Sequence, residues 1–196
     1  MIRATRHGAR DFLLAAATAW ALLATPGLGS STRDPLPEYP VKAAFLYHFA
    51  EFVEWPTASP LPPSTITIGV LGRDPFGEVL DKAILAKMAA GRTLVIRRFA
   101  APAALEPCEI LFISSSEMTH LPEILHHLQG APVLTVGEAD RFARRGGMIG
   151  FYSEDNRVRL EVNRAAAERA GLRLSSKLLA VARLVKPDAA ESGGGH

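Results

Sequence analysis

The sequence predicts an α/β protein, a single three-layer domain in which a mostly parallel sheet is flanked by helices, with a C-terminal antiparallel hairpin added. Short apolar runs alternate with amphipathic segments between residues 66 and 136, which is typical of chains that build a parallel sheet through helical crossovers. Two further strand-like runs flank the polar sequence SEDN, a turn signal. The 196 residues can bury one core and do not require a second domain.

The first 29 residues have the composition of a secretory leader. Three arginines within the first ten residues precede an apolar run over residues 12–24, and Gly27 and Gly29 provide a small-x-small cleavage site. The run is shorter than the roughly 20 residues that a membrane-spanning helix needs. We therefore expect a signal peptide that is cleaved on export to the periplasm, with an uncleaved leader as the alternative.

The remaining chain divides into three expected parts. Residues 30–38 are expected to be flexible, residues 39–187 to form the α/β domain, and residues 188–196 to be a disordered tail that contains the sequence ESGGGH. Removal of the leader takes away three arginines and one aspartate, so that 19 basic residues balance 19 acidic residues. A neutral domain makes a broad nucleic-acid-binding surface a poor hypothesis.

Cys108 is the single cysteine of the chain, so that no intrachain disulfide can form. It directly precedes an apolar run at residues 110–113. A buried and inert thiol is the simpler interpretation, and pairing with a second molecule is the alternative.

The first expected helix carries a broad stripe of apolar and aromatic side chains. Proline suits its first turn at position 40, and Pro56 restricts Trp55 to extended geometry and so ends the helix. A helix that covers a sheet needs such a face, so that most of the stripe is expected to be core, with a partner surface as the alternative. The positions of the stripe are Val41, Ala44, Phe45, His48, Phe49, Phe52 and Val53.

Strands and helices are then expected in alternation. Asp74 is a plausible N-cap for the first of these helices, because Pro75 follows it at a position that suits the first turn. Strands are expected at residues 66–71, 93–98, 109–114 and 132–136, and helices at residues 75–88 and 117–129.

The C-terminal third has a different pattern. Residues 147–152 and 158–162 are strand-like and are expected to form the antiparallel hairpin. Asn163 is expected to cap a short helix through Ala170. Ser175 and Ser176 are expected to start a last helix that continues through Leu184.

Signatures of enzymes and of metal sites are weak, and no catalytic activity is expected. Ser115 and Ser116 follow an expected strand directly and could include a nucleophile, but serines at such a junction normally satisfy helix amides. His120, His126 and His127 share one expected helix, but no two of them have the His-x3-His spacing of a metal-binding pair. We therefore expect no metal and no cofactor.

Polar side chains are placed at the carboxyl ends of the expected parallel strands, where open α/β sheets bind small ligands. Arg73 and Asp74 follow the first strand, Ser115 follows the third, and Glu138 follows the fourth. These four residues are the candidate ligand site, which would suit a small polar or anionic molecule. The alternative is that they turn the chain and cap helices.

An ordered set of motifs resembles the YfiR family of small exported bacterial proteins. The resemblance covers nearly the whole chain after the leader, from Tyr39 to about Val185, and its specificity lies in the order of the motifs. They are VKAAFLYHFAEFVEWP, ITIGVLGRDPFGEVLDKAI, CEILFIS, PVLTVGE, GGMIGFYSEDNRVRLEVN and AGLRLSSKLLAVARLV.

The resemblance implies a non-enzymatic periplasmic regulator that binds the periplasmic sensory region of an inner-membrane diguanylate cyclase. Such a repressor lowers cyclic di-GMP and biofilm formation, and capture by an outer-membrane lipoprotein releases the cyclase. Paired cysteines stabilise some relatives, and Cys108 matches one member of such a pair, which leaves redox control in doubt. The alternatives are a ligand-binding sensor or adapter for another membrane receptor and a hydrolase that uses Ser115 or Ser116.

Charged residues near the C-terminus are the candidate partner surface. Arg157, Arg159 and Glu161 alternate with apolar residues in the second strand of the hairpin, so that they share one face. Arg173 and Lys177 border the apolar stripe of the last expected helix. A sensory domain with acidic and apolar surface could bind there, and a homodimer is also compatible with the sequence.

We predict that the exported protein begins near residue 30. The basic n-region, the short apolar run and the small residues at positions 27 and 29 motivate this expectation. N-terminal sequencing of the protein from the periplasmic fraction is the measurement. A sequence that begins at Met1 would contradict the prediction.

Overall fold

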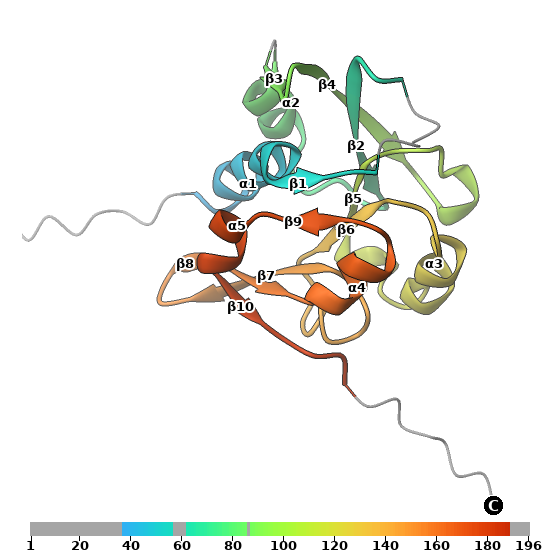
Figure 1. Ribbon diagram of the computed structural model, residues 1–196, viewed down its shortest axis with the longest axis vertical. Coiled ribbons are helices and arrows are strands. Elements are labelled where there is room, and N and C mark those ends of the chain that lie inside the picture. The colour runs from blue at the N-terminus through green and yellow to red at the C-terminus, as the bar shows by residue number, and fades with distance from the viewer. Residues whose placement is uncertain (1–36, 57–61, 86, 189–196) are drawn as a thin grey trace, which may run out of the picture. The chain divides into compact units, whose positions relative to one another are not determined.

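The described structure is a computed structural model that covers residues 37–56, 62–85 and 87–188 (Figure 1). The predicted leader, residues 30–36 of the expected flexible segment and residues 189–196 of the expected tail lie outside the described residues. The domain that remains is α/β, with the mostly parallel sheet and the C-terminal hairpin that the sequence predicts.

A central sheet of eight strands organises the domain, in the order β10-β8-β7-β6-β5-β2-β4-β3. All neighbours pair in parallel except the hairpin β7–β8 and the pair β3–β4. A separate small antiparallel sheet pairs β1 with β9. The strands are β1 (Val53–Glu54), β2 (Thr65–Leu71), β3 (Met88–Ala89), β4 (Arg92–Phe99), β5 (Ile110–Ile113), β6 (Leu134–Gly137), β7 (Ile149–Glu154), β8 (Arg157–Val162), β9 (Arg173–Leu174) and β10 (Ala182–Leu184).

Helices cover both faces of the sheet and complete the three layers. The helices are α1 (Glu38–Phe52), α2 (Glu78–Ile84), α3 (Leu121–His127), α4 (Arg164–Arg169) and α5 (Ser176–Ala180), with short 3₁₀ turns η1 (Pro102–Ala104) and η2 (Ser115–Glu117). Buried side chains of α1, α2, α4 and α5 share one core cluster with one face of the sheet. Those of α3 pack in a second cluster on the opposite face.

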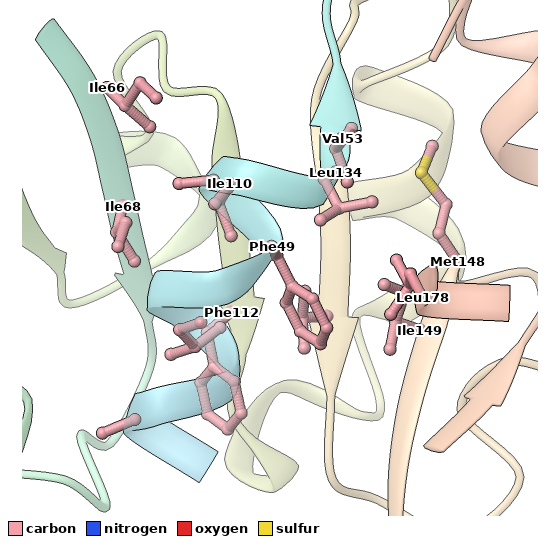
Figure 2. Close-up of a cluster of buried hydrophobic side chains, with 14 of the residues drawn as sticks. Phe49, Val53, Ile66, Ile68, Ile110, Phe112, Leu134, Met148, Ile149 and Leu178 are labelled. Atoms are coloured by element: carbon pink, nitrogen blue, oxygen red, sulfur yellow. The ribbon is translucent and has the colours of Figure 1, made fainter. Parts of the chain in front are cut away.

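The larger core lies between α1 and the sheet (Figure 2). Phe49 of α1 is fully buried and shares this cluster with Phe112 of β5 and Ile149 of β7. Its ring stacks on that of Phe151, with ring centres 6.1 Å apart. On β5, for example, Ile110 and Phe112 face this cluster, and Leu111 and Ile113 face the cluster of α3. Burial of such large apolar side chains is the main stabilising term for a domain with no disulfide.

The rotation of α1 differs from the expected one. Phe49 is buried as predicted, but Phe45 and Phe52 are half-buried and His48 is exposed. Lys42, which lies outside the expected apolar stripe, is buried although its side chain is charged. The helix is apolar on nearly all sides, so that its sequence pattern specifies the rotation weakly.

Two expected helices are shorter than predicted. The side chain of Asp74 accepts a hydrogen bond from the Phe76 amide at 2.7 Å in a turn, and α2 begins only at Glu78 after Gly77, whose φ is +50°. The segment expected as a helix over residues 117–129 splits into η2 and α3. Pro122 lies in the first turn of α3, where a missing amide hydrogen is tolerated.

The C-terminal hairpin is confirmed. Strands β7 and β8 pair antiparallel, and the two residues between them, Asp155 and Asn156, have φ values of +51° and +56°. Two consecutive left-handed residues form the turn that matches the twist of a hairpin. Asn163 then caps α4 as predicted, because its side-chain oxygen accepts a hydrogen bond from the Ala166 amide at 3.1 Å.

The last expected helix is wrong beyond Ala180. Ser175 caps α5 as expected, through a 3.3 Å hydrogen bond from the Leu178 amide, but the helix spans only five residues. The chain then enters β10, which pairs in parallel with β8 at the edge of the sheet. Hydrogen bonds to a distant strand determine this segment, and a local pattern does not reveal them.

Cys108 is buried as predicted, with 3% of its surface exposed. It packs against Gly69 on β2, where an added side-chain carbon would lie 3.2 Å from the sulfur. Burial raises the pKa of the Cys108 thiol to about 12, and the neighbouring Glu109 carboxylate acts in the same direction.

We predict that the native protein resists thiol reagents at pH 8. With a pKa about four units above the solution pH, about one Cys108 side chain in ten thousand is a thiolate, and burial restricts access further. The rate of labelling by a disulfide reagent should rise sharply in urea, where the thiol is exposed. Rapid labelling without denaturant, or a melting temperature that falls on addition of reductant, would contradict the inert role.

Candidate partner-binding surface

An apolar groove lies between α1 and α5. Phe45, His48, Phe49 and Phe52 of α1 form one side, and Lys177, Leu178 and Val181 form the other. We call these seven residues the α1–α5 groove. Its volume is about 310 Å³. Val181 is 65% exposed although it is apolar.

The groove follows from the rotation of α1 and the length of α5. The buried positions of α1 face the sheet, and the rings of Phe45 and Phe52 are directed to its flank. The five-residue α5 places Leu178 in the core next to α1 but is too short to cover the whole flank. Apolar side chains therefore line an open surface, which in soluble proteins often marks an interaction site.

The rim of the groove carries charge. His48 Nδ1 lies 2.9 Å from Glu51 Oε2, and the His48 ring stacks on Phe52 with ring centres 5.8 Å apart. The hydrogen bond with His48 lowers the pKa of Glu51, helped by a second one from Tyr47, while partial burial opposes the shift. Lys177 is exposed and forms no ion pair with any described residue. One unpaired cation thus borders an apolar surface.

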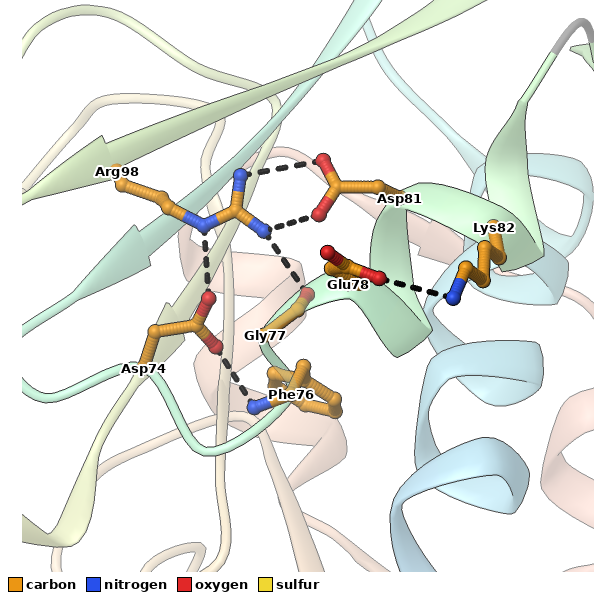
Figure 3. A network of polar contacts seen from close by, with 7 residues as sticks. All are labelled: Asp74, Phe76, Gly77, Glu78, Asp81, Lys82 and Arg98. Carbon is orange, nitrogen blue, oxygen red and sulfur yellow. Dashed lines mark hydrogen bonds and ion pairs between the residues drawn. The ribbon is translucent and has the colours of Figure 1, made fainter.

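Two of the four strand-end residues that the sequence predicts as a ligand site, Asp74 and Glu138, are engaged with other parts of the protein. Asp74 accepts a hydrogen bond from Arg98 Nε at 2.7 Å, and Arg98 also reaches Asp81 at 2.6 Å and the carbonyl of Gly77 at 3.1 Å (Figure 3). These bonds lower the pKa of Asp81 and raise the pKa of Arg98. The arrangement fastens β4 to the turn before α2.

The crevice between β2 and β5, where strand order reverses, is filled by serine and glutamate side chains. Ser116 Oγ accepts a hydrogen bond from the Arg73 amide at 3.0 Å, and Ser114 Oγ accepts one from the Ser116 amide at 3.4 Å. A side-chain carbon on Gly72 would lie 2.5 Å from Ser116 Oγ. Ser115 and the Arg73 side chain are exposed. Ser114 thus caps η2, and Ser116 holds the turn that follows β2.

Glu138, the fourth predicted ligand residue, holds the buried Lys42. The Lys42 ammonium lies 2.5 Å from Glu138 and 2.5 Å from Glu38, and 4.9 Å from the centre of the Tyr39 ring. Burial disfavours the charged ammonium, but the hydrogen bonds to both carboxylates outweigh it and raise the pKa of Lys42. The side chain therefore stays charged and ties α1 to the end of β6.

The family comparison identifies the chain. A model of the YfiR/HmsC-like family matches residues 39–183, which is most of the sequence. The chain belongs to the YfiR/HmsC-like family. Membership indicates a periplasmic regulator of diguanylate cyclase signalling and a regulatory rather than catalytic protein.

Two other comparisons add little to the YfiR/HmsC-like assignment. No curated protein matches the chain. Among solved structures, it is similar to the ABC domain in complex with L-Trp from Streptococcus pneumonia, with 12% identity and a TM-score of 0.46. The match covers 64% of this chain and 57% of that chain. Within the described residues, every helix is too short or too polar to cross a lipid bilayer.

The structure divides the predicted partner residues of this YfiR/HmsC-like chain between two faces of the sheet. Lys177 lies at the groove on the α1 face, and Arg173 is exposed on β9, whose Leu174 packs with the same core. Arg159 and Glu161 alternate with Leu160, which packs on that core, and so face the opposite side. The five residues therefore do not form one surface.

Most charges on the hairpin face are paired with one another. Arg159 lies 3.8 Å from Glu154, and Glu161 lies 3.4 Å from Arg144 and 3.7 Å from Arg183. Arg157, at the start of β8, is exposed. The pairing reduces the net field that this face presents to a partner.

We predict that Lys42→Met destabilises the fold by about 3–5 kcal/mol, because it leaves the Glu138 carboxylate buried without its partner. The free energy of unfolding in urea is the measurement. Lys177→Met, at an exposed position, is the control and should change it little. The double variant Lys42→Met/Glu138→Leu should recover part of the loss. A single variant as stable as wild type would show that the pair does not hold α1.

Proposed function

We propose that the protein represses an inner-membrane diguanylate cyclase by binding its periplasmic sensory region, and thereby lowers cyclic di-GMP and biofilm formation. The α1–α5 groove is the observation that carries the proposal. Family membership supports the signalling role, and the groove offers a surface of the kind that holds protein partners, with aromatic side chains and a cation beside them. Capture of the protein by an outer-membrane lipoprotein would then release the cyclase.

One of the large apolar side chains exposed on the described surface, Val181, lies in the groove. The large apolar residues exposed on the described surface are Leu85, Met88, Val95, Val181 and Leu184. Val181 lines the groove, and Leu184 follows three residues later. A partner that covered both would remove apolar area from water, which is the usual source of affinity at the centre of an interface.

The alternative, a sensor for a small ligand, has less support. Asp74 and Glu138 hold Arg98 and Lys42, so that a ligand would have to displace ion pairs within the protein. The groove, in contrast, is open and mostly apolar, with an aromatic wall on α1. These contacts favour a protein partner over a polar metabolite at the strand ends.

We predict that deletion of the gene raises cellular cyclic di-GMP and surface attachment, and that a gene carrying Val181→Asp fails to restore them. A carboxylate in the groove should weaken binding by about tenfold or more, because apolar contacts there would be lost. Val181 is exposed, so that folding should be unaffected. Quantification of cyclic di-GMP and an immunoblot of the periplasmic fraction are the measurements.

Leu85→Asp is the matched control, because Leu85 is 77% exposed and lies outside the groove. It should complement like wild type. Lys177→Glu and Arg159→Glu, tested singly, distinguish whether repression depends on the groove or on the hairpin face. Unchanged cyclic di-GMP after deletion, with the cyclase expressed, would refute the repressor role. Full complementation by Val181→Asp would leave the role intact and refute the groove as its surface.

A further inference from the structure

Strand β10 is the terminal strand of the central sheet within the described part of the chain. It pairs with β8 on one side, in the register Ala182 with Leu160, Arg183 with Glu161 and Leu184 with Val162. Its other side is an edge. Unpaired amide and carbonyl groups on a sheet edge can accept another extended chain.

The direction of each backbone group follows from one hydrogen bond. The Val185 amide donates a hydrogen bond to the Val162 carbonyl at 2.9 Å, so that this amide points toward β8. Successive residues of a strand direct their amides to opposite sides. The Arg183 amide therefore also faces β8, and the Ala182 and Leu184 amides point outward from the sheet.

Side chains give this edge an apolar face and a charged face. Ala182 packs on the core cluster of α1, and Leu184, two residues later, lies on the same side with 56% of its surface exposed. Arg183 lies on the other side, 4.7 Å above the Tyr152 ring and 3.0 Å from Glu154.

The edge continues directly into the α1–α5 groove. Val181 lines the groove and is the residue immediately before β10. An extended segment lying along β10 would thus have main-chain partners at Ala182 and Leu184, and a side chain near Val181 would reach the aromatic walls. Main-chain bonds that supply affinity, next to a pocket that selects a side chain, are the two parts of strand-addition sites.

The charge around the edge indicates the chemistry of the occupant. Lys177 precedes β10 in the chain and Lys186 follows it; both are exposed and form no ion pair within the described part of the chain. A segment that brings carboxylates beside its apolar side chain would pair with both. A basic segment would meet repulsion at both ends.

We infer that β10 accepts an extended segment of the cyclase's periplasmic region as an additional strand, with an apolar side chain of that segment in the α1–α5 groove and acidic residues beside it. This inference rests on the proposed function and specifies how the partner is held. The added strand extends the eight-stranded sheet beyond β10 and covers Leu184.

Hydrogen exchange of single amides, followed by NMR, tests the added strand without any substitution. The free protein should exchange the Leu184 and Ala182 amides fast and the Arg183 and Val185 amides slowly. In complex with the purified periplasmic region of the cyclase, Leu184 and Ala182 should become protected as well. Unchanged fast exchange at Leu184 in a saturated complex would overturn the inference and leave the proposed function standing.

A proline substitution gives an independent test. Leu184→Pro removes an amide hydrogen that points outward, and it leaves the hydrogen bonds to β8 in place. Edge strands tolerate proline at such outward-facing positions. Leu184→Thr keeps the amide and removes much of the apolar surface of the side chain. The comparison therefore separates the main-chain hydrogen bond from the apolar contact of Leu184. Leu184→Pro should weaken binding by at least about fivefold relative to Leu184→Thr, with equal melting temperatures. Equal affinities would overturn the inference.

Two further outcomes would exclude the cyclase segment as the occupant of the edge. Wild-type protein that does not bind the cyclase region at all would overturn both this inference and the proposed function. Protection of the Leu184 amide in the free protein, together with a dimer mass by sedimentation, would assign the edge to a second copy of the chain and overturn the cyclase strand.

Discussion

The ion pair between Lys42 and Glu138 is the contact on which the arrangement of the domain depends. A helix that is apolar on most sides could pack against a sheet in several rotations, since each would bury similar side chains. A buried ammonium accepts few positions, because it must lie beside a carboxylate. Glu138, fixed at the end of β6, provides that position. The pair thus directs Phe49 to the core and leaves Phe45 and Phe52 on the flank.

The same rotation connects stability with recognition. The side chains that leave the core on the flank of α1 form one wall of the α1–α5 groove, so that the groove follows from how the helix is held. A change at Lys42, which does not itself line the groove, would therefore reshape the surface that we propose for the cyclase. Mutations that weaken repression need not lie in the interface.

Sequence patterns predicted the layers, the hairpin and most strands, because short apolar runs and turn residues such as Asp155 and Asn156 act locally. They failed where contacts between residues far apart in the sequence determine the burial of a side chain or the secondary structure of a segment. Lys42 is polar by composition, and Glu138, which explains its burial, lies 96 positions away. Residues 182–184 continue a helical pattern, yet backbone bonds to β8 make them a strand. The groove combines both failures: Lys177 was predicted as a partner residue, but the aromatic stripe of α1 was expected to be mostly core, with a partner surface only as the alternative.

The pairing of β1 with β9 has a consequence for how the domain is assembled. Val53 pairs with Leu174, so that residues from the beginning and the end of the domain lie side by side. The α1–α5 groove needs both ends, since one wall comes from each. Contacts between segments so distant in sequence require closure of a long loop, and the second segment is synthesised last. A newly made chain therefore has no groove until its last segment is in place, and a chain that loses residues after Ser175 loses the surface altogether.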